Sequence, residues 1–110
     1  MDRLKHALEY AAKRQQDRSD RLGFVYIIQC HDLVKVGIAN KPKFRLIELQ
    51  VGCPYKLHLL KTFQTRRPTA DEKRLHKHWK AFEVRGEWFS VPVGELAAVL
   101  DADTIDQAIV

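Results

Sequence analysis

The sequence predicts a small α/β (α+β) domain in which a hairpin-led mixed sheet of three to four strands is flanked by helices. Its 110 residues are the length of one domain. Hydrophobic side chains make up 45% and charged side chains 30% of the chain, which is typical of a globular protein rather than a disordered one. Apolar residues recur at helical spacing in some segments and alternate in others, so both helices and strands are expected.

The first segment has helical spacing. Residues 2–20 contain neither glycine nor proline, and Leu4, Leu8 and Ala11 form a thin apolar stripe along them. We expect a helix that packs either along the domain or against a second copy, which would give a homodimer. This helix would form an N-terminal extension over residues 1–22.

Two β-rich runs follow, over residues 23–30 and 33–38. The two residues between them, His31 and Asp32, predict a tight hairpin. With the turn at this point, one face of the hairpin is almost wholly apolar and must be buried. The expected register pairs Val25 with Ile38, Ile27 with Val36, Gln29 with Val34, Tyr26 with Gly37 and Ile28 with Lys35.

The other face of the hairpin brings a phenol and an ammonium together. Tyr26 and Lys35 share this face, and Gly37 leaves the space beside the tyrosine ring open. The structural interpretation is a half-buried aromatic ring next to a surface lysine. On these residues alone the structural interpretation is favoured.

Glycine, proline and asparagine mark the ends of the later elements. Asn40 is expected to cap a helix that has Pro42 in its first turn, and Gly52 and Pro54 end that helix. Gly86 precedes a short strand. In order, the expected elements are a helix over 41–51, a strand over 57–63, a helix over 69–83, a strand over 87–91 and a closing helix over 93–108.

Arg45 lies at the margin of an apolar seam formed by Leu46 and Leu49 on the 41–51 helix. An arginine at such a margin can keep its aliphatic stem packed while its guanidinium contacts a phosphate.

Glu72 and His76 lie one turn apart at the edge of the buried stripe of the 69–83 helix. A carboxylate at this position can bind a hard divalent cation, with water and substrate phosphates completing the coordination shell. A structural role is favoured on these residues alone, because Thr69 and Glu72 have the spacing of a capping box. His76 would then be an ordinary edge histidine. The buried stripe consists of Leu75, Trp79 and Phe82.

Charge is distributed unevenly along the chain. The net charge is +5, yet residues 35–80 contain 12 basic and 3 acidic side chains and residues 81–110 contain 1 and 6. This asymmetry indicates a polyanionic partner, with nucleic acid first, although a solvated charged surface would look the same.

The sequence contains no apolar run that could span a membrane and no secretory signal. Its 2 cysteines are too few for a disulfide framework or a four-cysteine zinc site, and no pair of cysteine or histidine residues has zinc-ligand spacing. We therefore expect a cytoplasmic protein with no membrane partner.

A set of short motifs follows these elements in order, and each motif alone is weak. They are FVY at 24–26, KVG at 35–37, Arg45 in the next helix, Glu72 with Leu75 and His76 in the later helix, and Gly86-Glu87-Trp88-Phe89.

Together these motifs resemble the GIY-YIG nuclease superfamily, and most closely its short phage and prophage branch, the T5 orf172-like domains. The resemblance covers about residues 23–91, which are expected to form the nuclease domain, with residues 92–110 as an acidic helix packed on it. The sequence departs from the family pattern at Phe24, which replaces a glycine, and at Lys35, which replaces a tyrosine. The family's late active-site asparagine has no counterpart, because Asn40 is the only asparagine.

The resemblance implies a metal-dependent phosphodiester hydrolase. In this interpretation Tyr26 activates water or acts as the general base, Arg45 stabilises the phosphate, and Glu72 binds one Mg²⁺ or Mn²⁺. Lys35 and His76 would assist. Gly37, Gly86, Trp88 and Phe89 are expected to be structural.

The leading functional hypothesis is an endonuclease of low sequence specificity that cuts DNA, with RNA left open as a substrate. The alternative is a nucleic-acid-binding protein of the same fold without activity, in which Glu72 only caps its helix. A protein–protein module is disfavoured by the basic segment. The residues expected to contact nucleic acid are Lys35, Lys43, Arg45, Lys61, Arg66, Arg67, Lys73, Arg74, Lys77 and Lys80.

Overall fold

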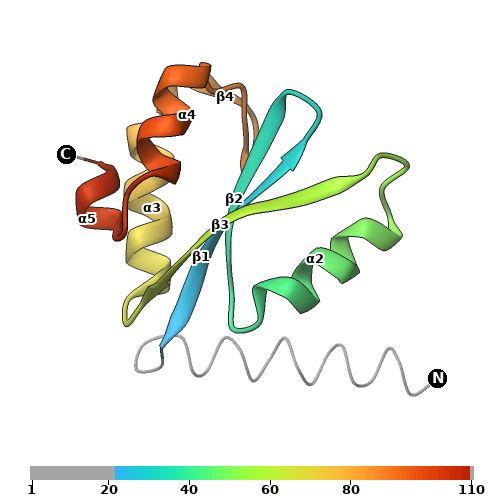
Figure 1. Ribbon diagram of the computed structural model, residues 1–110, viewed down its shortest axis with the longest axis horizontal. Coiled ribbons are helices and arrows are strands. Elements are labelled where there is room, and N and C mark those ends of the chain that lie inside the picture. Colours follow the sequence, from blue (N-terminus) through green and yellow to red (C-terminus); the bar gives the residue numbers. More distant parts are fainter. Residues whose placement is uncertain (1–21, 110) are drawn as a thin grey trace.

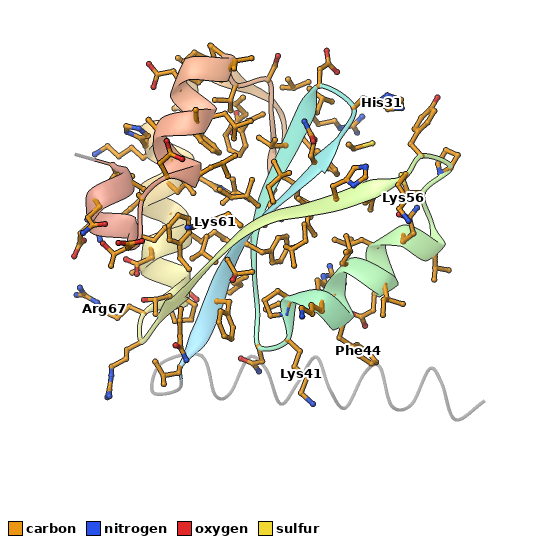
Figure 2. All side chains as sticks on the ribbon, viewed as in Figure 1. His31, Lys41, Phe44, Lys56, Lys61 and Arg67 are labelled. Carbon is orange, nitrogen blue, oxygen red and sulfur yellow. The ribbon has the colours of Figure 1, made fainter. Side chains whose placement is uncertain are left out.

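The β1–β2 hairpin has the register that the sequence predicts. In the computed structural model, which describes residues 22–109, Tyr26 faces Gly37 and Ile27 faces Val36. His31 has a φ of 55° at the turn, and its ring lies 4.3 Å from that of Tyr55, centroid to centroid, in the loop after α2. Figure 2 shows His31 at the hairpin tip. The expected helix over residues 2–20 and the homodimer through it lie outside the described residues.

The elements alternate much as expected, with one additional strand and a divided closing helix. Figure 1 shows them in place. Their bounds are β1 Gly23–Cys30, β2 Leu33–Ala39, α2 Pro42–Val51, β3 Leu57–Thr65, α3 Pro68–His78, a 3₁₀ turn Lys80–Phe82, β4 Glu83–Arg85, β5 Trp88–Phe89, α4 Val93–Leu100 and α5 Ile105–Ala108.

The α+β class is confirmed, but the sheet has five strands in the order β3-β1-β2-β5-β4, and every pair is antiparallel. A mixed sheet of three to four strands is therefore wrong in detail. The α2 crossover makes β2 and β3 parallel in direction, but β1 lies between them, so no parallel pair forms. The extra strand arises because the helix expected to reach residue 83 ends at His78, and Gly86, with a φ of 57°, turns β4 back onto β5.

The sheet separates two layers of helices. Figure 1 shows α2 on one side and α3, α4 and α5 on the other. Alternation along β1 supplies both cores, because Val25 and Ile27 face α3 while Tyr26 and Ile28 face α2. Among the described residues, the helices are all too short or too polar to cross a lipid bilayer.

Two of the expected helix caps are wrong. Helix α2 begins at Pro42 with Lys41 as its N-cap, so Asn40 does not cap it. Helix α3 begins at Pro68, which places Thr69 inside the first turn, where its buried hydroxyl has no hydrogen-bond partner. In both helices the rigid φ of proline fixes the start, and a proline at the first position has no N–H that a cap must satisfy.

The segment expected as one closing helix is divided after Leu100. Helix α4 ends there, and α5 restarts at Ile105 with the Thr104 hydroxyl accepting the Gln107 N–H at 3.2 Å. Both parts pack against the larger core, because Val99 and Ile105 are buried in it. The break therefore lets both helices contribute apolar side chains to the core that contains Leu75 of α3.

Candidate functional site

The site begins at the edge of β2. Strand β5 pairs with β2 at Val34 and Lys35. At the next residue the Val36 N–H donates to the Glu87 carbonyl at 3.0 Å, and the Val36 carbonyl accepts from His76 Nε2 at 2.9 Å. The edge of β2 is therefore held at this point by a turn and an imidazole.

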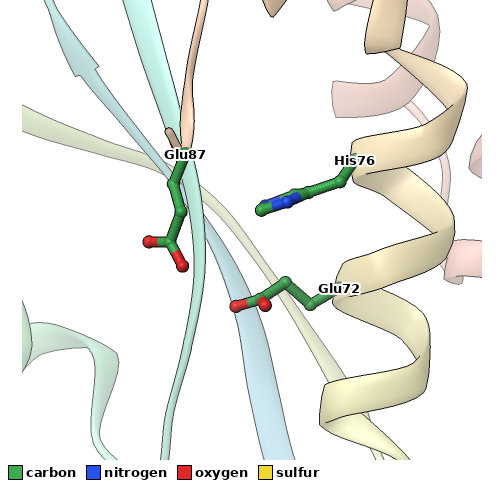
Figure 3. Close-up of side chains that lie close together, drawn as sticks. All are labelled: Glu72, His76 and Glu87. Carbon is green, nitrogen blue, oxygen red and sulfur yellow. The ribbon is translucent and has the colours of Figure 1, made fainter. Parts of the chain in front are cut away.

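Three potential metal ligands converge beside this edge. Ligand atoms of Glu72, His76 and Glu87 all lie within 4.8 Å of one another, and the three residues are half-buried. Figure 3 shows Glu72 and His76 extending from adjacent turns of α3 toward Glu87, which comes from the turn between β4 and β5. Two carboxylates at this spacing repel each other, and a cation between them removes that repulsion.

The hydrogen bond to β2 fixes the tautomer of His76. A carbonyl oxygen only accepts, so Nε2 carries a proton in the bond to Val36. In the neutral ring the lone pair is then on Nδ1, and any role as a ligand falls to that atom. The ring also packs edge-on against Phe89, at 5.2 Å between centroids, which holds its plane.

Lys35 contacts the carboxylate cluster rather than the tyrosine. Its Nζ lies 2.5 Å from Glu87 Oε2, and the ammonium also stands 5.9 Å from the centroid of the Trp88 ring. The Lys35 ammonium therefore forms an ion pair with Glu87 in place of the expected contact with the Tyr26 phenol. Lys35 supplies positive charge to Glu87 and orients this carboxylate.

Tyr26 lies over the neighbouring Gly37 of β2, on the face of the sheet that α2 covers and opposite to the face that α3 covers. Its ring lies over Gly37, where an added Cβ would stand only 2.5 Å from the tyrosine Cζ. The Val36 carbonyl that accepts from His76 belongs to the Val36–Gly37 peptide, so imidazole and phenol lie on the two sides of one peptide unit. Any side chain at position 37 would displace the phenol.

Arg45 completes this group from α2. Burial lowers the pKa of its guanidinium, but the adjacent Tyr26 phenol and the Glu48 carboxylate more than offset this effect, and the pKa is raised above its usual value. Glu48 Oε1 lies 3.5 Å from Nη1, while the buried Nε has no hydrogen-bond partner. Arg45 is therefore a permanent cation beside the phenol, with donor capacity left for an anion.

A family model, the T5orf172 domain, matches residues 23–102. The chain belongs to this family. It is a phage-associated family whose domain is endonuclease-like. The match extends beyond the expected boundary at residue 91 and takes in all of α4. Neither a curated protein nor a solved structure is detectably similar to the chain.

In this T5orf172 domain, two of the residues expected to act in catalysis contact the Val36–Gly37 stretch of β2 directly, His76 through the Val36 carbonyl and Tyr26 over Gly37. Arg45 lies beside Tyr26, and Glu72 lies with His76 and Glu87. The capping-box alternative for Glu72 loses its basis, because Thr69 is not the N-cap of α3.

The residues expected to contact nucleic acid differ in their exposure and in whether they form ion pairs within the chain. Arg74 is bound by Asp71 at 3.1 Å and by Asp106 at 2.8 Å, and Lys80 pairs with Glu83 at 3.1 Å. Figure 2 shows Lys61 and Arg67 on the side of the molecule away from α2. Among the residues expected to contact nucleic acid, the exposed ones are Lys43 on α2, Arg66 and Arg67 before α3, Lys73 and Lys77 on α3, and Lys80 after it.

Sequence reasoning missed Glu87 as a site residue. The motif Gly86-Glu87-Trp88-Phe89 predicts structural roles for Gly86, Trp88 and Phe89, and the missing late asparagine of the family leaves His76 as the candidate replacement polar contact. The signal that could have identified it is a second carboxylate, Glu87, which follows Glu72 in the chain and stands next to the turn glycine Gly86. The fold brings that side chain to the cluster because β5 pairs with β2 beside it.

Proposed function

We propose that this domain is a GIY-YIG-type endonuclease that hydrolyses phosphodiester bonds in DNA with the help of one divalent cation. The observation that carries the proposal is the convergence of Glu72, His76 and Glu87 within 4.8 Å at the edge of β2. The T5orf172 membership supports it, because the domain is endonuclease-like.

The donor set fits a hard or borderline divalent cation. Two carboxylates suit Mg²⁺ and Mn²⁺, and an imidazole favours Mn²⁺ over Mg²⁺ because it is the softer ligand. Glu72 and Glu87 would hold the ion, with His76 as a third ligand or as an orienting group. When bound, such an ion supplies positive charge to phosphate oxygens and to a coordinated water.

The other side chains supply charge and proton transfer. Arg45 would bind a non-bridging phosphate oxygen, whose negative charge increases as water attacks. Tyr26 lies beside this guanidinium and over Gly37, and we propose that its phenol accepts a proton from the attacking water. Lys35 orients the Glu87 carboxylate through its 2.5 Å ion pair.

DNA is the proposed partner because the two helices that carry Arg45, Glu72 and His76 also carry exposed lysines. Lys43 lies on α2, and Lys73 and Lys77 lie on α3. Contacts of lysine and arginine with the phosphate backbone carry no base information, so we propose low sequence specificity.

The test is cleavage of supercoiled plasmid, linear duplex, single-stranded and branched DNA with Mg²⁺ or Mn²⁺. The variants are Glu72→Ala and, as a matched control, Glu95→Ala, which removes an exposed carboxylate on α4. We expect metal-dependent cleavage by the native chain and by E95A. For E72A we expect a loss on the order of 10²-fold or more, because a site for transition-state charge is removed.

The alternative function, binding of nucleic acid without cleavage, has its own outcome. It predicts salt-sensitive DNA binding by the native chain and E72A alike, with no cleavage under any metal condition. Cleavage that persists in E72A would exclude the proposed site.

A further inference from the structure

The tip of the β1–β2 hairpin presents two aromatic rings to solvent. His31 and Tyr55 are both exposed, Tyr55 by 54%, and their ring planes meet at 79°. The rings come from separate segments, because His31 lies in the hairpin turn and Tyr55 in the loop between α2 and β3. Figure 2 shows His31 and Lys56, the neighbour of Tyr55, at the same end of the molecule.

His31 has a backbone conformation that favours glycine. Among residues 22–109 it is the one non-glycine residue with a positive φ, 55°. Glycine is the usual residue in this conformation because it has no Cβ to clash with the backbone. The imidazole is therefore kept at the tip at a cost in stability, and such costs concentrate at functional positions.

The loop that carries Tyr55 is held by the side chain of one residue of α2, Gln50. Its Nε2 donates to the Tyr55 carbonyl at 2.8 Å, and its Oε1 accepts from the Leu57 N–H at 2.8 Å. Both bonds use backbone groups of the loop, so they do not require the phenol ring. A ring on a loop that is already held in place loses little conformational freedom when a ligand stacks on it.

We propose that His31 and Tyr55 form a platform on which an unpaired nucleobase stacks, so that the DNA bound by this domain is single-stranded or locally unpaired. Every base has an aromatic face, so stacking on exposed aromatic side chains tolerates any sequence. Net charge contributes little, because exposed Lys56 beside Tyr55 and exposed Asp32 beside His31 have opposite signs. The proposal rests on the proposed function, whose substrate class it names.

The platform lies along β2 from the proposed metal cluster. Five positions separate His31 from Val36, whose carbonyl accepts from His76, and a strand rises about 3.4 Å per residue. The tip is therefore about 15 Å from that edge of β2. A strand with stacked bases rises about 3.4 Å per nucleotide, so four or five nucleotides would span this distance.

The experiment compares the binding of two oligonucleotides of the same length, one of thymidine and one abasic, in EDTA so that no metal-dependent cleavage occurs. The variants are Tyr55→Ala and His31→Gly. We expect the affinity of each variant for the thymidine oligonucleotide to fall about 5- to 100-fold, the range for loss of one stacked base. Affinity for the abasic oligonucleotide and the dependence of binding on salt should not change, because no phosphate contact is removed.

Thermal unfolding of H31G separates this role from a structural one. Glycine relieves the strain of the positive φ, which offsets the loss of the ring contact with Tyr55. We expect the unfolding midpoint of H31G to equal or exceed that of the native chain while its affinity for the thymidine oligonucleotide falls. A ring that only stabilises the turn predicts the reverse, a lower midpoint with unchanged affinity.

Two controls accompany these variants. Tyr55→Phe keeps an aromatic face and should bind the thymidine oligonucleotide as the native chain does. Phe44→Ala removes another exposed aromatic ring, 60% accessible, from the first turn of α2, and it should leave both affinities unchanged.

Three outcomes would overturn the proposal. They are native affinity of Y55A for the thymidine oligonucleotide, an equal loss of affinity for both oligonucleotides, and a native chain that binds duplex DNA but no single strand. A chain that cleaves DNA while Y55A binds normally would contradict the platform alone. A chain that binds thymidine through the platform but does not cleave DNA would contradict the nuclease alone.

Discussion

Helix α3 carries charged side chains on two faces, and the two faces are completed in different ways. On the rear, Asp71 accepts from the Thr65 hydroxyl at 2.5 Å and from Arg74 at 3.1 Å, so each carboxylate oxygen has a donor within the chain. On the front, Glu72 lies with Glu87 and His76 within 4.8 Å.

We assign the rear face to stability and the front face to the proposed function. On the rear, the Arg74 guanidinium binds both Asp71 and Asp106, so it joins two carboxylates from separate segments of the chain. On the front, two carboxylates and one imidazole converge, and Lys35 holds Glu87 through an ion pair. Carboxylates and an imidazole gathered at one point are a donor set that a divalent cation can use.

The largest expected effect is on Mn²⁺ binding at the front face of α3. Glu87→Gln keeps the size of the side chain but removes one carboxylate and the ion pair with Lys35. We expect Mn²⁺ affinity to fall about 10- to 100-fold and cleavage to fall with it. Calorimetric titration and plasmid cleavage measure the two effects. Glu83→Gln, on the neighbouring β4, is the control and should change neither.

The next largest effect tests the packing of the Tyr26 ring over Gly37. Gly37→Ala would place a Cβ 2.5 Å from the Tyr26 Cζ, so the ring must move. We expect destabilisation by about 1–3 kcal/mol in denaturant unfolding, with loss of cleavage because the phenol is displaced. Gly94→Ala is the control, since its Cβ would meet nothing within 4 Å. A fully active G37A would contradict a role for the Tyr26 position.

The sequence predicted the hairpin register residue by residue, because a two-residue turn leaves one way to pair strands whose apolar positions alternate. It also predicted the buried positions Leu75 on α3 and Trp79 at its C-cap, which follow helical spacing and are fully buried, whereas Phe82 lies in the 3₁₀ turn and is only partly buried. Local patterns were sufficient where one face of an element had to be buried.

The missed features depend on contacts between distant segments. Strand β4 lies next to β5 only because α3 ends at His78 and Gly86 turns the chain back. Glu87 joins the cluster, and Lys35 is redirected from Tyr26 to Glu87, through the same pairing of β5 with β2. The spacing of residues along the sequence does not predict that β5 pairs with β2.

A smaller effect tests the rear face. Asp71→Asn replaces one of two accepting oxygens with an N–H₂ group that faces another donor, either the Thr65 hydroxyl or Arg74. We expect a loss of about 1–3 kcal/mol in the free energy of unfolding, with unchanged Mn²⁺ affinity. A D71N chain of native stability that binds Mn²⁺ poorly would reverse the assignment of the two faces.

The smallest effect concerns the release of Arg74. Asp106 is exposed and binds Arg74 at 2.8 Å, so it competes with any phosphate for that guanidinium. We expect Asp106→Asn to raise DNA affinity about two- to fivefold, the modest gain typical of an exposed ion pair. Asp103→Asn is the matched control, with the same change in net charge on the same segment. Equal gains in both variants would mean that only net charge matters.

The central claim is that the front of α3 binds one divalent cation, and calorimetric titration with Mn²⁺ tests it most directly. The native chain and D71N should each bind one equivalent, and Glu72→Gln should bind none in the same range. A native chain that binds no Mn²⁺, or an E72Q chain that binds it as tightly as the native one, would contradict the claim.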